Sequence, residues 1–405
     1  VTKFHILYKY STKFAIVFLS QQLMKTLFLI FHGRFPSEKA ASLFAAKESE
    51  AFASEGYNVV LLVPRRLGVD RSDPYSFYGV RKNFRIMYLP TLDLFGVSIL
   101  SRIAFYASLI VFSFSVLVYI ITRSDRSDII YSNEHLPLLL TSLVRRNTFY
   151  EVHDMPEHNR FFYALLLRRI KGAIVTNRWK LETITRIFKT PHTKLFYEPN
   201  AVEISDFDIV TTKEEARIKL GIKPQTPIVL YTGHLYSWKG VETLARAGEL
   251  VGDLVSIYVV GGTKKDILQF RERFGYILNL HIIGYRPHSE IPLWQKAADV
   301  VVLPNTARED ISKYYTSPMK LFEYMASKRP IVATDIPSVR EILDDSSAII
   351  VAPDDPGAMA RGIVNALEDH DLTNRITDTA YQSVKLHTWD KRAKRILKFV
   401  EKGNQ

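Results

Sequence analysis

Two segments of the second half of the sequence combine glycine, lysine and a carboxylate at spacings that suit a nucleotide site. In the first, Thr232-Gly233-His234 follows an apolar run and Lys239-Gly240 stands where a helix should begin. Backbone N–H groups at a helix start and a lysine ammonium are groups that bind a diphosphate. The spacing differs from that of a P-loop. We expect Lys239 to bind phosphate, the alternative being a solvated surface lysine.

The second segment runs from Ser317 to Thr334 and begins Ser317-Pro318-Met319-Lys320. Pro318 near the first helical turn leaves the N–H groups of its neighbours free for a ligand. Glu323 lies in the following helix, and its carboxylate can accept two hydrogen bonds from a ribose diol. A buried carboxylate without a partner is costly, which favours a ligand role. A salt-bridging helix glutamate is the alternative.

The first half of the sequence offers weaker candidates. His32-Gly33-Arg34 follows the first predicted strand, Gly33 permits a tight turn, and Ser37 is expected to cap the next helix. The loop lacks the G-x-G-x-x-G pattern, so an ordinary capped turn explains it equally well. His153 ends another predicted strand and can donate to a sugar hydroxyl or a phosphate oxygen. A purely structural histidine is the alternative.

These candidates need a scaffold, and apolar runs alternate with amphipathic ones along the whole chain. That alternation predicts βα units, and we expect two doubly wound Rossmann-like sheets that face each other across a cleft. The expected strands are Thr26–His32, Asn58–Val63, Arg85–Leu89, Asp128–Ser132, Phe149–His153, Ala173–Thr176, Ile228–Thr232, Val255–Val260, Leu280–Ile283, Asp299–Leu303, Pro330–Thr334 and Ala348–Val351. Ligands of such sheets lie at the carboxyl ends of the strands.

Helices are expected between the strands, at Glu38–Ser54, Gly240–Leu250, Lys264–Phe274, Ile291–Ala298, Pro318–Ser327 and Pro356–Glu368. The polar segment Ile204–Pro227 is the expected hinge. We therefore predict an N-terminal extension over 1–23, a first domain over 24–203, a second domain over 204–385 and a C-terminal segment over 386–405.

Composition narrows the function classes. The 405 residues include 47% hydrophobic and 24% charged residues, which is typical of folded domains. The chain has no cysteine, which excludes disulfides, thiolate nucleophiles and zinc–thiolate sites. Residues 24–203 hold 24 Lys and Arg against 16 Asp and Glu, a net of +8, whereas residues 204–405 hold 27 against 26. The basic half indicates an anionic partner, or else a merely soluble basic face.

One stretch departs from the soluble pattern. The 20 residues Ile103–Thr122 carry no charge and are flanked by Arg102 and Arg123. A buried or groove-lining helix, a helix lying on a membrane and a true membrane span are all open. The span fits least, because Asp128–Ser132 reads as the next core strand. Nucleic acid is not an expected partner, because the basic residues do not interleave with aromatic ones in a compact motif.

Together these motifs resemble the group 1 glycosyltransferases, a family of retaining enzymes (family 4) with the GT-B fold. The resemblance runs from about residue 26 to residue 400, in the order of the family. The residues that carry it are His153-Asp154, Glu198-Pro199-Asn200-Ala201-Val202, Thr232-Gly233 with Lys239-Gly240, Val260-Gly261-Gly262, Ala298-Asp299 with Leu303-Pro304, and Ser317–Thr334.

The resemblance implies roles for these residues. Lys239 would bind the donor diphosphate, Glu323 the nucleotide ribose, and His153 would lie near the transferred sugar, so these three form the predicted catalytic set. The other predicted donor-binding residues are Gly33, Arg34, Gly233, His234, Gly262, Tyr285, Ser317, Pro318, Met319 and Lys320. Gly33 and Arg34 would line either the donor phosphates or the acceptor. The resemblance also implies that 24–203 is the acceptor-side domain and 204–385 the nucleotide-sugar-binding domain. Within 386–405, the helix Trp389–Val400 would cross back to the first domain.

Two positions depart from the family pattern. Tyr315 stands where the family often has the first of two glutamates eight residues apart, and His234 replaces its usual arginine. Glu309 or Asp310 could take the part of the missing glutamate in holding sugar hydroxyls. The histidine implies a weaker or pH-sensitive diphosphate clamp.

The expected function is transfer of a sugar, with retention, from a UDP- or GDP-linked donor to a saccharide or lipid-linked acceptor. Such a reaction would serve cell-surface polysaccharide or glycolipid synthesis at the inner face of the cytoplasmic membrane. No metal ion and no cofactor beyond the donor are expected, because the pocket already supplies positive charge through Lys239. The alternatives are a nucleotide-sugar 2-epimerase and a non-catalytic nucleotide-sugar-binding or scaffold protein.

Overall fold

A computed structural model describes residues 25–67, 72–93, 101–155, 160–222 and 226–402. The predicted extension 1–23 lies outside these residues. The described residues form two compact units, the first drawn from 1–151, 159–173 and 397–405 and the second from 152–158 and 174–396. Each unit is described by itself, and the domain boundaries expected from the sequence stay predictions.

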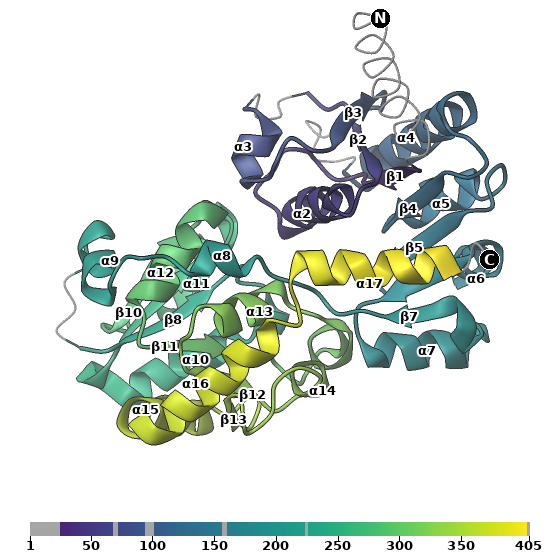
Figure 1. Cartoon of the computed structure of the whole chain (residues 1–405). Helices are drawn as coiled ribbons and strands as arrows, with labels where there is room; N and C mark the ends of the chain where they lie inside the picture. The colour runs from purple at the N-terminus through teal and green to yellow at the C-terminus, as the bar shows by residue number, and fades with distance from the viewer. Residues whose placement is uncertain (1–24, 68–71, 94–100, 156–159, 223–225, 403–405) are drawn as a thin grey trace, which may run out of the picture. The chain divides into compact units, whose positions relative to one another are not determined.

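The first sheet has seven strands in the order β3-β2-β1-β4-β5-β6-β7 (Figure 1). β1 pairs in parallel with both β2 and β4, so the strand order reverses between β1 and β4. The strands are β1 (Thr26–Ile30), β2 (Asn58–Pro64), β3 (Arg85–Leu89), β4 (Ile129–Ser132), β5 (Thr148–Val152), β6 (Gly172–Val175) and β7 (Leu195–Tyr197). The helices between them are α2 (Ala40–Ser54), α3 (Pro74–Tyr78), α4 (Ser101–Arg123), α5 (His135–Thr141), α6 (Arg160–Arg169) and α7 (Arg178–Phe188).

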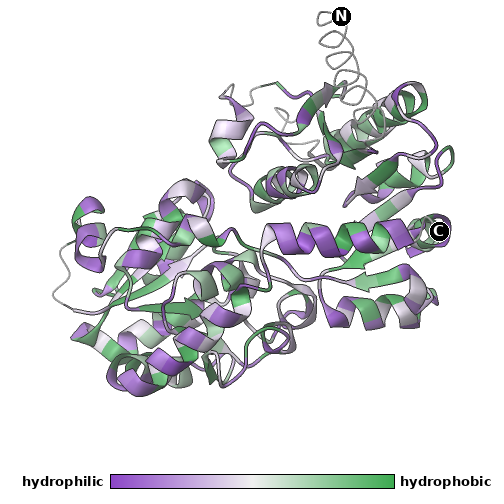
Figure 2. Ribbon diagram, in the orientation of Figure 1, coloured by the Kyte–Doolittle hydropathy of each residue, from purple (hydrophilic) through white to green (hydrophobic). Residues whose placement is uncertain are grey.

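The second sheet has six strands in the order β10-β9-β8-β11-β12-β13, with the reversal between β8 and β11. Its strands are β8 (Ile228–Thr232), β9 (Ser256–Val260), β10 (Leu280–Gly284), β11 (Val300–Leu303), β12 (Ile331–Thr334) and β13 (Ile349–Val351). Its helices are α8 (Ile204–Phe207), α9 (Lys213–Lys219), α10 (Val241–Val251), α11 (Lys264–Phe274), α12 (Ile291–Ala297), α13 (Met319–Ala326), α14 (Pro337–Arg340), α15 (Pro356–Glu368) and α16 (His370–Val384). Figure 2 shows the central strands in the green of hydrophobic residues, as expected for parallel strands covered on both faces.

The prediction of two doubly wound parallel sheets is confirmed, and most expected strands match within one or two residues. β7 was missed because three residues are too few for a periodic signal. The expected hinge contains two short helices, α8 and α9, the second with a full capping box. The predicted cap of α2 is wrong, because Lys39 occupies that position without a side-chain cap. Ser37 instead hydrogen-bonds the Ser42 hydroxyl at 3.0 Å.

The last helix, α17 (Trp389–Lys402), is held by buried polar contacts at its start. The Arg395 guanidinium donates twice to the buried Glu198 carboxylate, at 2.7 and 2.6 Å. Arg392, almost fully buried, donates to the Pro199 carbonyl at 3.0 Å. Near its end the Phe399 ring packs edge-on to Phe149, with ring centroids 6.2 Å apart. These contacts fix α17 to the chain around β7.

Candidate functional site

The loop that carries Lys239 lies at the point where the second sheet reverses its strand order. β8 ends at Thr232, and a 3₁₀ turn over Ser237–Lys239 leads into α10 through Gly240. Gly240 has a φ of 68°, and a Cβ added there would lie 1.9 Å from the carbonyl oxygen of Pro304. Pro304 follows β11, the neighbour of β8. Glycine is therefore required here, and the loop closes on the switch point, where such sheets bind ligands.

Two buried lysines meet at this loop. The Lys239 ammonium lies over the Trp238 ring, 3.7 Å from its centroid, and the Lys320 ammonium lies 3.8 Å from the centroid of Tyr231. Burial lowers the pKa of Lys239 to about 7. Burial and the nearby Lys239 charge together hold the pKa of Lys320 well below its usual range. Among the described residues, the Lys320 ammonium has no hydrogen-bond partner.

An unpartnered amine in the interior is costly, so its presence points to an absent anion. Gly233 makes room for it, because a Cβ at that residue would lie 2.6 Å from Lys320 Nζ. Gly233 also has a φ of 125°, which side-chain-bearing residues avoid. The structure thus brings together the predicted Gly233, Lys239 and Lys320, and the burial of Lys239 excludes the alternative of a solvated surface lysine.

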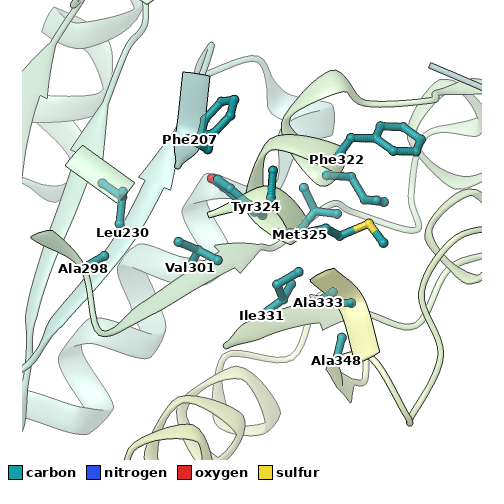
Figure 3. Close-up of a cluster of buried hydrophobic side chains, with 14 of the residues drawn as sticks. Phe207, Leu230, Ala298, Val301, Phe322, Tyr324, Met325, Ile331, Ala333 and Ala348 are labelled. Atoms are coloured by element: carbon teal, nitrogen blue, oxygen red, sulfur yellow. The ribbon is translucent and has the colours of Figure 1, made fainter. Parts of the chain in front are cut away.

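Helix α13 presents Lys320 from its first turn. Pro318 occupies the N-cap position without a side-chain cap, so it leaves helical N–H groups uncapped as expected. Asn200 hydrogen-bonds to the Ser317 carbonyl through its side chain and to the Ser317 hydroxyl through its N–H, which fixes the turn. Figure 3 shows the other face of α13, with Phe322 and Met325 in the apolar core. The helix start is therefore held rigidly beside the lysines.

Glu323 is buried, and a partner that the sequence did not predict contacts it. His288 Nε2 lies 3.0 Å from Glu323 Oε1, and becomes an ion-pair partner when the histidine is protonated. His288 begins a 3₁₀ turn after β10. The carboxylate is therefore neither unpartnered nor part of a salt bridge within its own helix. Only the fold brings residues 288 and 323 together, and no local sequence signal pairs them.

The remaining predicted residues of the second sheet follow adjacent strands. The loop after β8 approaches the end of β9 closely, since the Gly233 N–H donates to the Val260 carbonyl at 2.8 Å. The loop after β9 contains Gly262, which has a φ of 88°, and Tyr285 follows β10 half-exposed. The His234 ring stacks on Tyr236 at a centroid distance of 5.0 Å. All of these residues lie at the same edge of the sheet as Lys239.

The position of the missing family glutamate is filled by a turn that the sequence did not predict. Ile311–Tyr315 forms a π-helical turn, and Asn177 holds it by donating to the Tyr314 carbonyl at 2.6 Å. Just before this turn, Glu309 accepts a hydrogen bond from the Ser237 hydroxyl at 2.7 Å. Ser237 belongs to the turn of Lys239. Glu309 thus has a direct link to the lysine loop, and its expected role in place of a glutamate at position 315 stays a prediction.

The candidates from the first half of the chain are placed within their own surroundings. His153 follows β5, and its carbonyl accepts a hydrogen bond from Lys180 at 2.6 Å. Arg34 is exposed in the first unit, where the preceding His32 N–H donates to Glu134 at 3.2 Å. A Cβ on Gly33 would lie 2.1 Å from the Phe31 ring, which explains the glycine. The functional roles of His153, Gly33 and Arg34 stay predictions.

Sequence comparisons identify the family of the second sheet. The family model described as Glycosyl transferases group 1 matches residues 226–369. An uncharacterized glycosyltransferase of Methanocaldococcus jannaschii is 27% identical over 222 residues, 53% of this chain and 55% of its own. The phosphatidyl-myo-inositol mannosyltransferase of Mycolicibacterium smegmatis is 25% identical over 60% of this chain and 59% of its own. The chain thus spans about half the length of these curated relatives.

Solved structures share the whole fold. Sucrose-phosphate synthase from Thermosynechococcus elongatus superposes with a TM-score of 0.75 at 18% identity, over 93% of this chain and 98% of its own. An Anabaena protein crystallised with UDP and glucose gives a TM-score of 0.72 at 19% identity, over 93% and 99%. The fold is that of GT-B glycosyltransferases. Residues 226–369, which hold both lysines and Glu323, thus match the group 1 glycosyltransferases, the family that the sequence resembles.

Proposed function

We propose that this chain is a glycosyltransferase that takes its sugar from a nucleotide-diphosphate donor. The observation that carries the proposal is the pair of buried lysines, Lys239 and Lys320, at the switch point of the second sheet. A diphosphate would supply the missing anion for both ammonium groups and for the uncapped start of α13. The Anabaena structure with UDP and glucose, which has the same fold, supports the same class of ligand.

The rest of the donor site follows from this placement. Glu323 would accept the ribose hydroxyls, and His288 would orient its carboxylate. Glu309 and His153 would contact the transferred sugar. Leaving-group charge would be stabilised by the two lysines and by helical N–H groups already aimed at the phosphates, which is the electrostatic form of catalysis. We propose retention through front-face attack, because no side-chain nucleophile of the chain is assigned to the sugar.

The acceptor, cofactor and location complete the proposal. The acceptor is a saccharide or a lipid-linked saccharide. Two relatives support this class of acceptor: the phosphatidyl-myo-inositol mannosyltransferase and a putative teichuronic acid biosynthesis glycosyltransferase of Bacillus subtilis. The lysines and helix N–H groups would carry the charge compensation that a metal ion provides elsewhere, so we propose metal-independent transfer. We place the protein at the inner face of the cytoplasmic membrane, as a peripheral protein supported by its basic first half.

A thermal-shift screen with UDP, GDP and ADP tests donor binding. A ligand present at a hundred times its Kd adds about 2.7 kcal/mol of apparent stability. We expect a shift with UDP or GDP and its loss in Lys239→Ala. No shift with any nucleotide would refute the proposal.

Turnover is tested with Lys239→Ala and Glu323→Gln, which we expect to lose nearly all transfer while remaining folded. Lys313→Ala is the matched control, because Lys313 lies in the same unit but is only half-buried. Normal turnover in both site variants would contradict the assignment.

A non-catalytic nucleotide-sugar-binding protein is the second candidate, and Tyr315 is the observation that favours it. The tyrosine removes one carboxylate that could hold sugar hydroxyls. Glu309→Gln separates the two functions: if Glu309 holds the sugar, this variant should lose transfer but keep its thermal shift with the nucleotide alone. A wild type that binds nucleotide but transfers to no acceptor would favour the second candidate.

A further inference from the structure

The longest helix of the first unit exposes an apolar face. α4 carries seven exposed apolar or aromatic side chains, which we name the outer face of α4: Ile103, Phe105, Tyr106, Ile110, Phe114, Val118 and Ile121. Their three- and four-residue spacing keeps most of them on one side of the helix. In the described part of the chain, α4 is the helix long and apolar enough to cross a membrane. Figure 2 draws it largely in green.

The opposite face of α4 belongs to the core of the unit. Phe112, Val116 and Ile120 are fully buried, and the Tyr119 ring packs edge-on to Phe28 of β1 at 6.1 Å. The buried Ser108 hydroxyl hydrogen-bonds His32 at 3.2 Å. A membrane span would strip these contacts from the sheet. The outer face must therefore meet its partner while the inner face stays packed, which requires a helix that lies flat.

A comparison with another surface helix shows how unusual the outer face is. α16 has 15 residues, and its exposed positions are all polar: His370, Asp371, Asn374, Arg375, Asp378 and Gln382. A soluble surface is normally built in this way, and a contiguous apolar face indicates a binding surface. The outer face of α4 runs for about 27 Å at 1.5 Å per residue. It is thus long enough to lie along a membrane surface.

The charges at the carboxyl end of α4 indicate the kind of partner. Arg123, Arg126 and Arg146 are exposed there, against one exposed acidic residue, Asp125. The Arg145 guanidinium donates to the Ser124 carbonyl at 2.8 Å, and so holds the loop after α5 against this end. Leu143 and Val144 of that loop are exposed and extend the apolar surface. Apolar side chains bordered by arginines match the boundary of acyl chains and anionic headgroups.

We propose that the outer face of α4 inserts into one leaflet of an anionic phospholipid membrane, with the helix axis parallel to the surface. Arg123, Arg126 and Arg146 contact the headgroups. A second copy of the chain would bury the apolar side chains equally well, but it would bring three arginines against the same three. The membrane avoids this repulsion and uses the positive charge.

Insertion of the outer face of α4 would bring the membrane close to the loop that we expect to meet the acceptor. The Phe105 and Phe112 rings lie 5.5 and 5.3 Å from the ring of His32, which directly precedes Gly33 and Arg34. Arg66 donates to the His32 carbonyl at 2.9 Å and adds a second cation. A lipid-linked acceptor would thus emerge from the membrane beside a basic loop at the switch point of the first sheet. This step rests on the proposed transferase function, whereas the insertion itself does not.

Vesicle sedimentation with the full chain tests the proposal. The probe is phosphatidylcholine vesicles with and without phosphatidylglycerol. We expect wild type to pellet with the anionic vesicles, and the triple variant Ile110→Gln, Phe114→Gln, Val118→Gln to bind them about tenfold more weakly or worse. The matched control is Ile218→Gln, Leu254→Gln, Leu268→Gln, which removes three even more exposed apolar side chains of the second unit. It should bind vesicles as wild type does.

The charge is tested by Arg123→Gln with Arg126→Gln, which should weaken binding to anionic vesicles about tenfold and leave neutral vesicles unaffected. Undiminished vesicle binding by the apolar triple variant would overturn the proposal, as would a wild type that ignores anionic vesicles. Loss of a dimer in the triple variant, with vesicle binding intact, would assign the face to a second copy instead. Each variant is also tested for a thermal shift with UDP or GDP, which shows whether its nucleotide site is intact independently of vesicle binding. Vesicle binding without any nucleotide shift would reject only the proposed function.

Discussion

Replacing Lys320 with methionine should stabilise the free protein and weaken its binding of a nucleotide diphosphate. Methionine keeps the length of the side chain and removes the amine. In the free protein that amine is buried, lacks a hydrogen-bond partner among the described residues and lies beside a second buried lysine. With a diphosphate bound, the same amine would be protonated and would donate to phosphate oxygens. The two effects of Lys320→Met therefore have opposite signs.

The magnitudes follow from the contacts. A buried polar group without a partner costs about 1–3 kcal/mol. Methionine also removes the contact of the ammonium with the Tyr231 ring, 3.8 Å from its centroid, worth about 0.5–2 kcal/mol. The net gain in the free energy of unfolding should be about 1 kcal/mol, or a Tm rise of about 2–4 °C in a unit of this size. Loss of a hydrogen bond to a charged phosphate costs about 1.5–3 kcal/mol, which weakens nucleotide binding about 10- to 150-fold.

The assay is a melting curve of each protein with and without UDP and GDP, joined to titration calorimetry for the Kd. Lys313→Met is the matched control, because the Lys313 ammonium lies 5.0 Å from the Tyr314 ring but is only half-buried. It should change neither Tm nor Kd appreciably. A lower Tm together with an unchanged Kd in Lys320→Met would show that the lysine is a structural group and would refute the reasoning.

Three further outcomes are expected. The pKa of Lys239 in the folded protein is about 7, below its ordinary value, so the free energy of unfolding should fall as the pH is lowered from about 10 towards 7. Diphosphate binding needs the charged lysine and should therefore weaken by up to about tenfold per pH unit above 7, and a pH-independent Kd in calorimetry would contradict this. Gly240→Ala should lower the free energy of unfolding in urea by about 2–4 kcal/mol, because the new Cβ would clash with the Pro304 carbonyl. Gly221→Ala has the same φ of 68° but open space around it and should lower it by about 1 kcal/mol, so equal losses would exclude the steric cause. Arg395→Leu should destabilise by about 3 kcal/mol because it leaves the buried Glu198 carboxylate unpaired. Arg273→Leu, which breaks an ion pair with Glu242 in which both side chains are exposed, should cost below about 1 kcal/mol, and similar losses in the two variants would show that burial does not decide the value of the pair.

Much of the fold could be predicted because each sheet repeats one strong pattern. Ile228–Thr232 was predicted to the residue, since a short apolar run bounded by polar residues specifies a buried parallel strand. Arg85–Leu89 was also predicted to the residue, although most of this edge strand is exposed or half-buried. Ser37 was assigned as a cap from its type alone, but its hydroxyl bonds the Ser42 hydroxyl and the Lys39 N–H, while its backbone N–H donates to the Tyr78 hydroxyl. Local sequence patterns therefore predicted which helices and strands form, whereas the contacts in the folded protein determined where some of them begin and end.

The site was predictable as far as its residues lie close together in sequence. Gly233, Lys239 and Glu323 belong to motifs whose spacing is visible, whereas the contact of His288 with Glu323 joins residues 35 positions apart. The link between Glu309 and Ser237 spans 72 positions. The sequence also could not show that Lys320 would be a buried amine without a partner, because its exposure depends on how α13 packs against β8. Partners brought together by the sheet topology need the structure.

The two switch points of the chain carry different electrostatics, and the difference separates their roles. At the first, between β1 and β4, Arg34 is exposed and the half-buried Arg66 donates to the His32 carbonyl. At the second, between β8 and β11, two lysines are buried together and Lys320 has no acceptor in the described chain. The second site is destabilised until an anion binds, and functional sites are where such costs are retained. We therefore propose that the diphosphate of the donor binds at the second sheet and that the exposed Arg34 of the first sheet meets the acceptor.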